Sequence, residues 1–309
     1  SVDVLQNALA QTVFAGTQAP KKAAGRALGT LVELITFYMI REWGLEPNLA
    51  IERGLPEYGN SQIRHNVEFT LHPPQAVASL PLDADKSRTS ARITRQLTDA
   101  GHAGQLTGAT ARKTIALQRG AVLRHSATFA DAPGGFFTAY ATGGAASFNV
   151  SRLIEVPFAM FECKRVGIEE GQKKGPQTIE KAKQGAYVAR SVSGLQRIAR
   201  RDGSVAALVE EADGTLTTHA DYYQFLRDAI DAGDKKALAN VVLTVGVVSN
   251  HGNWFTAQTQ NKEMRVLAQS YDWLLFLTDN ALAEFIETVL QGQDPAFKAT
   301  RAAFGASHG

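Results

Sequence analysis

The chain has 309 residues, 44% of them hydrophobic and 20% charged, a composition that excludes disordered and fibrous proteins. Its formal net charge of +2 is only mildly basic, so bulk electrostatics neither require nor exclude a polyanionic partner. A single cysteine, Cys163, excludes an internal disulfide. No run resembles a signal peptide or an uninterrupted apolar span of membrane length, so we expect a cytoplasmic protein without membrane contact.

The first predicted element is an amphipathic helix from Pro20 to Trp43, in which apolar residues recur at helical spacing and the run ends at Gly44. Short strands are predicted at 50–54 and 63–74, and a short helix over 91–100. Two later segments have the composition to reach a ligand. The first, residues 113–124, mixes basic and apolar side chains, and the second, residues 134–144, is aromatic with glycines at both ends.

A denser alternation of strands and helices follows. Strands are predicted at 147–154, 157–165, 240–249 and 271–277, and helices at 177–200, 256–269 and 279–291. Nearly continuous apolar strands between helices are typical of a sheet that is covered on both faces. We therefore predict an α/β fold with a central mixed β-sheet flanked by helices. No linker rich in Pro, Gly or Ser divides the chain, which predicts one domain over residues 1–309 carrying insertions.

The E-x-K triplet formed by Glu162, Cys163 and Lys164 lies near the end of the largely apolar strand PFAMFECKR. Alternate residues of a strand share a face, so Glu162 and Lys164 project together. Phe161, Cys163 and Met160 are expected to fill the opposite side. A carboxylate that holds Mg²⁺ against a phosphate, and an ammonium that stabilises developing charge, together suit phosphodiester hydrolysis. An E-x-K triplet is most often a solvated strand face, but this one is followed by a basic, glycine-containing segment.

The stretch SFNVSRLIEVPFAMFECKR, residues 147–165, resembles the catalytic hairpin of the PD-(D/E)XK nucleases, especially type II restriction endonucleases. In that family the E-x-K strand pairs with an earlier strand that carries an aspartate. The resemblance covers the core and not the whole chain. It implies a restriction-endonuclease-like core, Mg²⁺ as the cofactor with Mn²⁺ as a possible substitute, and double-stranded DNA as the substrate.

The position that corresponds to the family's aspartate is Asn149. If the two segments form a hairpin, Asn149 lies opposite Cys163. This is a departure from the family pattern, because an amide is a weaker ligand for a hard cation than a carboxylate. Three explanations remain open: the enzyme naturally uses Asn there, Asn149 is an engineered replacement of Asp, or the true acid is Glu155 or Asp131.

The resemblance also implies how the site is built. The metal would be held by Glu162, the Asn149 side chain and the Cys163 carbonyl, with Lys164 beside the attacking water. Glu33, on the first predicted helix, corresponds to a glutamate that faces the metal site in many family members. Its alternative is an exposed position on an amphipathic helix, and burial distinguishes the two.

DNA contacts are expected from two regions. Lys181, Lys183 and Gln184 lie on the helix predicted after the E-x-K strand, where basic and polar side chains can contact phosphates. Base recognition is expected from inserted segments within 50–144 and 201–239, through side chains that reach the groove edges.

The predicted function is that of a type II restriction endonuclease of a restriction–modification system, a Mg²⁺-dependent enzyme that cuts double-stranded DNA at a specific sequence. Such an enzyme matches the symmetry of a palindrome with its own, so we expect a homodimer. One alternative is a repair or recombination nuclease with the same core. Another, motivated by Asn149, is a DNA-binding protein that has lost catalysis. Zinc, P-loop, dinucleotide and nucleophilic-serine motifs are absent from the sequence.

Overall fold

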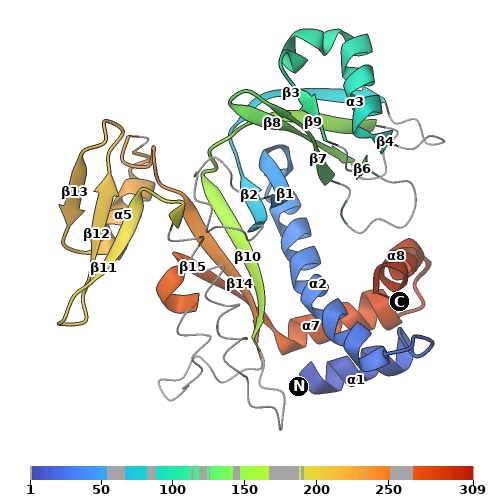
Figure 1. Ribbon diagram of the computed structural model, residues 1–309. Helices are drawn as coiled ribbons and strands as arrows, with labels where there is room; N and C mark the ends of the chain where they lie inside the picture. The colour runs from blue at the N-terminus through green and yellow to red at the C-terminus, as the bar shows by residue number, and fades with distance from the viewer. Residues whose placement is uncertain are drawn as a thin grey trace.

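The computed structural model describes residues 2–53, 67–81, 88–112, 115–117, 124, 126–141, 147–166, 188, 191–234, 236–250 and 267–308. Within these ranges the fold is mixed α/β and contains several separate β-sheets (Figure 1). The α/β class predicted from the sequence is confirmed.

A mixed five-stranded sheet forms the centre of the fold, in the order β1-β2-β10-β14-β15. Its strands are β1 (Leu49–Arg53), β2 (Val67–Leu71), β10 (Ala159–Val166), β14 (Leu243–Asn250) and β15 (Trp273–Thr278). β2 is antiparallel to β1 and to β10, whereas β10, β14 and β15 are parallel to one another. Both faces of β14 are covered, because Val247 belongs to a cluster with the residues of α2 while Val248 belongs to a second cluster.

Helix α2 (Pro20–Glu42) crosses one face of this sheet (Figure 1). It begins with proline in its first turn and ends just before Gly44, whose φ of 73° suits glycine, as predicted. By length and composition alone α2 would also qualify as a membrane-crossing helix, a test that core helices and signal sequences both pass. In this fold, 56% of that apolar window is buried inside the protein.

The other helices lie around this frame. α1 (Val2–Thr12) and α8 (Lys298–His308) pack near the first half of α2, in a core cluster that includes Leu9, Leu28 and Phe304. α7 (Asp279–Phe285) follows β15 and continues into the π-helical turn η5 (Ile286–Gln291). The remaining short turns are η1 (Glu46–Asn48), η3 (Thr98–His102), η4 (Ala103–Leu106) and η6 (Pro295–Phe297).

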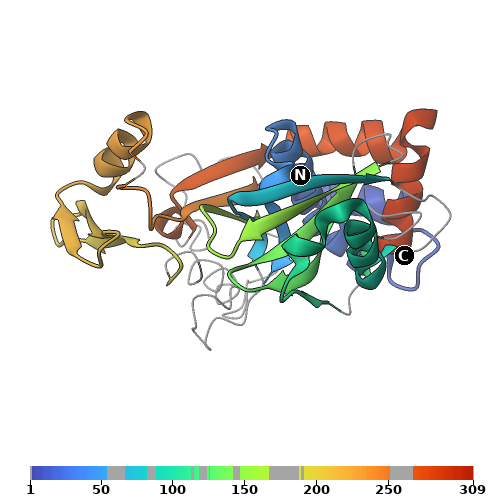
Figure 2. The same ribbon diagram turned by 90° about the horizontal axis from the view of Figure 1, so that it is seen from above.

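A second sheet is inserted between β2 and β10, in the order β3-β9-β8-β7-β5 (Figures 1 and 2). Its strands are β3 (Pro74–Pro81), β5 (Thr110–Ala111), β7 (Ser126–Ala132), β8 (Gly135–Ala141) and β9 (Ser147–Ile154), beside the two-stranded pair β4 (Arg88–Thr89) and β6 (Ile115–Leu117). Helix α3 (Ser90–Leu97) covers it with Ile93 and Leu97. The aromatic segment expected to reach a ligand instead forms β8, whose side chains are almost all buried.

The predicted hairpin between residues 147–154 and 157–165 is wrong. Both segments are strands, but β9 pairs with β3 and β8, whereas β10 pairs with β2 and β14. The chain leaves the central sheet after Leu71, builds the second sheet, and returns so that Ala159 lies opposite Leu71. Adjacency along the chain therefore does not give strand pairing here, because an entire sheet is inserted between the two paired strands.

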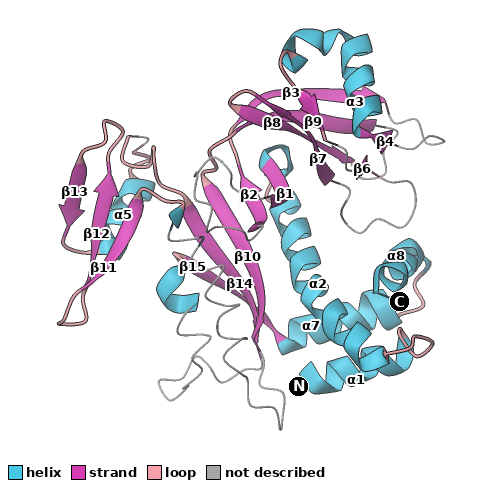
Figure 3. Cartoon of the chain, viewed as in Figure 1, coloured by secondary structure: helices cyan, strands magenta, loops and turns pink. Residues whose placement is uncertain are grey.

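A small third sheet, β11-β12-β13, stands apart from the central sheet with α5 against it (Figure 3). Its elements are β11 (Leu195–Ala199), β12 (Val205–Glu210), β13 (Leu216–His219) and α5 (Tyr222–Asp231). The helix predicted to run to residue 200 is therefore wrong at its end, since β11 occupies 195–199. Residues 177–187 of that predicted helix lie outside the described ranges.

Candidate functional site

Strand β10 brings Glu162 and Lys164 together. The Lys164 ammonium donates to Glu162 Oε1, and the Glu162 side chain is only 3% exposed. Alternation along the strand places Met160 on their face, in the cluster with Val248, so its predicted position on the opposite side is wrong. Phe161 lies in the other cluster, which faces α2. An acid and an amine thus share the face of a buried strand, as the sequence predicts.

A second carboxylate, which the sequence interpretation missed, lies on the neighbouring strand. β2 runs antiparallel to β10, and their paired residues end with Phe69 opposite Phe161, so Glu68 lies one residue beyond the paired region and within electrostatic reach of Glu162. The Glu68 side chain is 17% exposed, and burial raises the pKa of its carboxyl while Arg124 lowers it. A signal for it exists in the sequence, because Glu68 is the only charged residue of the strand segment VEFTL.

Helix α2 adds Glu33 to this group. Its side chain is 27% exposed, which favours the site position over an exposed one. Burial raises the pKa of the Glu33 carboxyl to about 7 from an ordinary value of 4.5, with Glu68 raising it further and Arg124 lowering it. The structure therefore brings Glu33 within electrostatic reach of both strand glutamates.

Arg124 lies between these acids. Its Nη1 donates to Glu68 Oε1 at 2.7 Å and lies 4.0 Å from Glu33 Oε2, while its Nη2 donates to Glu52 Oε1. Glu52, on β1, has a φ of 47°, a left-handed conformation that costs about 1 kcal/mol or more in a residue other than glycine. The guanidinium also lies over the Phe69 ring, 5.9 Å from its centroid.

Asn149 is not placed beside Glu162. It lies on β9 of the second sheet, opposite Ser79 and Tyr140. Burial raises the pKa of the Tyr140 hydroxyl, and the nearby side chains of Ser151 and Asn149 lower it. The geometric reason for choosing Asn149 as a metal ligand was the hairpin, and the observed strand pairing removes it.

The two reserve acids are also elsewhere. Asp131, on β7, accepts two hydrogen bonds from Arg112, at 2.8 and 3.0 Å. Glu155 follows β9, and its backbone N–H donates to Gly134 O. Neither lies on a strand that pairs with β10, whereas Glu68 lies on β2, which does.

The side chain of Cys163 faces α2, where its thiol donates to Thr36 Oγ1 at 3.3 Å. Burial raises the pKa of this thiol well above its ordinary range, so the sulfur stays a neutral thiol. Only the main-chain carbonyl of Cys163 is left as a ligand, which is the atom that the resemblance implies. The predicted DNA contacts Lys181, Lys183 and Gln184 lie outside the described residues.

The chemistry of this group suits a hard divalent cation, because Glu33, Glu68 and Glu162 offer carboxylate oxygens from three different elements. Within the described ranges, however, no three Asp, Glu, His or Cys side chains converge closely enough to hold a metal ion as they stand. The guanidinium of Arg124 lies between Glu52 and Glu68.

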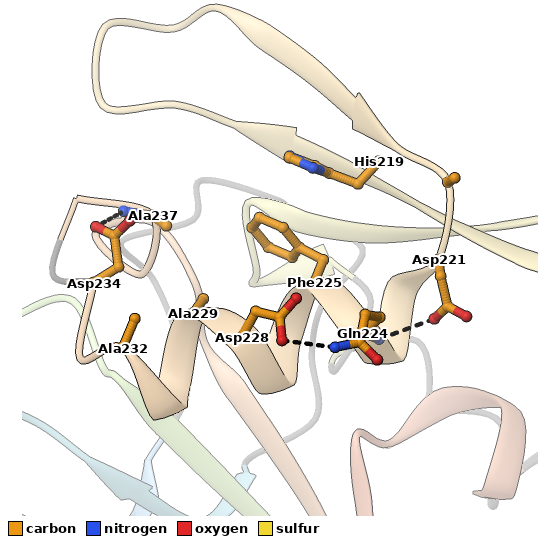
Figure 4. A pocket seen from close by; sticks show the side chains of 10 residues that line it. His219, Asp221, Gln224, Phe225, Asp228, Ala229, Ala232, Asp234 and Ala237 are labelled. Carbon is orange, nitrogen blue, oxygen red and sulfur yellow. Dashed lines mark hydrogen bonds between the residues drawn. The ribbon is translucent and has the colours of Figure 1, made fainter.

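A surface hollow lies beside α5 (Figure 4). Three aspartates line it, and its base holds the rings of His219 and Phe225, whose centroids are 4.2 Å apart. Each aspartate accepts a hydrogen bond from a residue close to it in the sequence. Asp221 caps the N-terminus of α5, Asp228 accepts from the Gln224 side chain, and Asp234 accepts from the backbone of the following turn. Such a surface repels phosphate, so it is not a candidate for nucleic-acid chemistry.

Replacing Glu33 with Gln is expected to flatten a decline in stability between pH 4.5 and about pH 7 in metal-free buffer. Because the folded-state pKa of Glu33 is raised, the folded chain holds this proton more tightly than the unfolded chain, and the free energy of unfolding falls as pH rises through that window. Glutamine stays neutral and removes about 1–3 kcal/mol of that decline.

Urea unfolding near pH 5 and near pH 8, with EDTA present, measures the effect. Glu42→Gln, at the exposed end of the same helix, serves as the control. Equal losses of stability in the wild type and in Glu33→Gln would contradict the prediction.

No protein-family model, no curated protein and no solved structure matches this chain.

Proposed function

We propose that this chain is a metal-dependent nuclease that hydrolyses phosphodiester bonds of double-stranded DNA, with the activity of a type II restriction endonuclease. The observation that carries the proposal is the pairing of β2 with β10, which brings Glu68 within electrostatic reach of the buried Glu162 and its partner Lys164. Two carboxylates and an amine on adjacent, largely buried strands are the kind of charged group that is often found at functional sites.

The arrangement of the strands supports a restriction-endonuclease-like core. The E-x-K strand of that family pairs with an earlier strand that carries the first acid, and a glutamate on the first helix faces the site. Here β10 pairs with the earlier strand β2, which carries Glu68, and α2 carries Glu33. The first acid is then a glutamate and not an aspartate, so it keeps the negative charge that Asn149 lacks.

In this proposal Mg²⁺ would be held by Glu68, Glu162 and the Cys163 carbonyl, with Glu33 close by. The bound ion would polarise the scissile phosphate and lower the pKa of a water. Glu162 keeps its orientation through Lys164, whose ammonium donates to it. An ammonium has only donors, so Lys164 stabilises the negative charge that develops on the phosphoryl oxygens. One water is consumed and one P–O bond breaks, leaving a phosphate monoester and a hydroxyl.

The distribution of charge supports DNA on the side of the second sheet. Residues 74–154 contain nine Lys and Arg against four Asp and no Glu, a formal charge of +5. Residues 201–239 contain four Lys and Arg against eight Asp and Glu, a formal charge of −4. Because phosphate contacts dominate DNA affinity, we place the DNA against the β3–β9 insertion and not against the β11–β13 sheet.

A homodimer in the cytoplasm remains part of the proposal, on the symmetry of palindromic sites. The inactive DNA-binding form loses its motive, which was Asn149, since Glu68 provides a carboxylate on the strand next to Glu162. A repair nuclease would use the same centre, and its products distinguish it.

Plasmid cleavage tests the proposed function. The wild-type chain is expected to cut a mixed-sequence supercoiled plasmid into discrete fragments with Mg²⁺ or Mn²⁺ and not in EDTA. Glu162→Gln is expected to lose at least about 100-fold of this activity, as when a transition-state contact is removed. The exposed Glu287→Gln, on η5, is the matched control.

No cleavage by the wild type, or cleavage that Glu162→Gln leaves unchanged, would overturn the proposal. Cleavage confined to junctions or ends would favour the repair nuclease.

A further inference from the structure

The carboxylates of the candidate site already hold a cation that belongs to the chain itself. Arg124 donates to Glu68 Oε1 at 2.7 Å through Nη1 and to Glu52 Oε1 through Nη2, and its Nη1 lies 4.0 Å from Glu33. Its side chain is 20% exposed, so water screens these contacts only partly. One guanidinium thus joins acids from β1, β2 and α2.

This arginine and a divalent metal need the same oxygens. Mg²⁺ binds carboxylate oxygens at about 2.0–2.1 Å, and a metal held by Glu68 and Glu162 would lie beside the oxygen that Arg124 occupies. Two cations at that separation repel strongly where solvent is largely excluded.

The balance of charges in the candidate site also favours competition between Arg124 and a divalent metal. Glu33, Glu52, Glu68 and Glu162 bring four carboxylates, against the two cations Arg124 and Lys164. Lys164 contacts only Glu162 among these acids, so Arg124 is the main counter-charge of the other three. When Arg124 is removed, the group has one more uncompensated negative charge to attract a divalent cation.

We propose that Arg124 is an internal counter-cation that competes with the divalent metal and must leave Glu68 before the metal binds. The inference rests on the proposed function only in taking Glu68 and Glu162 as the metal ligands. Arg124 then lowers the metal affinity of the resting protein and keeps the carboxylates paired when no metal is bound.

Calorimetric titration with Ca²⁺ in the absence of DNA tests this without any cleavage step. Arg124→Gln is expected to bind Ca²⁺ about tenfold more tightly than the wild type, because a positive charge leaves the site. Arg124→Lys keeps the charge and is expected to stay close to the wild type. Arg112→Gln is the matched control, since it removes an equal charge from the same insertion at a residue paired with Asp131.

Thermal unfolding with and without Ca²⁺ provides the second readout. Arg124→Gln removes a counter-charge from three acids, so it is expected to be less stable than the wild type without metal and to gain more from Ca²⁺. Ca²⁺ affinity in Arg124→Gln that is equal to or weaker than that of the wild type would overturn the proposal. So would a tightening that Arg112→Gln reproduces, which would reflect net charge alone.

The Ca²⁺ titrations distinguish failure of this inference from failure of the proposed function. If Arg124→Gln binds Ca²⁺ more tightly but Glu162→Gln binds as the wild type does, the competition is real and the metal site is not the predicted one. If neither the wild type nor Arg124→Gln binds Ca²⁺, removing the arginine opens no site and the inference is wrong, while plasmid cleavage still tests the nuclease separately.

Discussion

Glu68→Gln is expected to reduce plasmid cleavage at least about 100-fold, as Glu162→Gln does, whereas Asn149→Asp is expected to gain no activity. Glu68 lies on β2, which pairs with β10, and within electrostatic reach of Glu162, while Asn149 lies in a different sheet, opposite Ser79 and Tyr140. Glutamine keeps the size of the side chain and removes only the charge that a hard cation requires. Initial cleavage rates in saturating Mg²⁺ measure the effect.

Two controls make this result specific. Glu155→Gln removes the reserve acid near β9 and is expected to cut as the wild type does, and thermal unfolding verifies that each variant folds. A strong gain of cleavage in Asn149→Asp, together with full activity in Glu68→Gln, would restore residue 149 as the first acid and refute the site built here.

Asp272→Asn is expected to lower the free energy of unfolding by about 3–5 kcal/mol, the range for breaking a buried, hydrogen-bonded ion pair. The Asp272 side chain is only 5% exposed, and Oδ2 accepts from the backbone N–H and the hydroxyl of Thr244, at 2.7 and 2.8 Å. Oδ1 accepts from Arg197 Nη2 at 3.1 Å and from the Tyr222 hydroxyl.

These bonds join the central sheet to the third one, because Thr244 lies on β14, whereas Arg197 and Tyr222 lie on β11 and α5. Burial and the neighbouring Asp272 raise the pKa of the Tyr222 hydroxyl, so it remains a neutral donor. An amide at residue 272 would offer one acceptor in place of two and leave Arg197 without its counter-charge.

Urea unfolding of Asp272→Asn and of the exposed Asp228→Asn on α5 measures this difference. The second replacement makes the same chemical change at the surface and is expected to cost less than about 0.5 kcal/mol. Similar losses in both variants, each below about 1 kcal/mol, would show that the network does not stabilise the fold.

Most elements were predictable because their signals are local. The apolar spacing and the flanking Pro20 and Gly44 predicted α2, and the apolar runs predicted β10, β14 and β15 within a few residues. The predictions were wrong where a sequence pattern is compatible with both a helix and a strand. Residues 195–199 lie at the end of the helix predicted over 177–200, yet they form a strand that pairs with β12. Tertiary contacts here outweigh a weak local preference for helix.

Some residues of the candidate site were likewise predictable from the sequence, and others were not. The common face of Glu162 and Lys164 follows from the two-residue period of a strand, and Glu33 followed from the family resemblance. Glu68 and the position of Arg124 did not follow. Each depends on which strand lies next to β10 and on where a segment of the insertion returns to the central sheet.

The sequence by itself determined the α/β class, the limits of the main strands and α2, and the E-x-K pair on one strand face. Only the tertiary structure decided that β2, and not β9, is the neighbour of β10, and therefore that Glu68, and not Asn149, is on the strand next to Glu162. The physical reason is that the entropic cost of closing a loop rises only slowly with its length, so an entire sheet can be inserted between two paired strands. Periodicity reports which face of a strand is buried, and it carries no information about the strand that lies beside it.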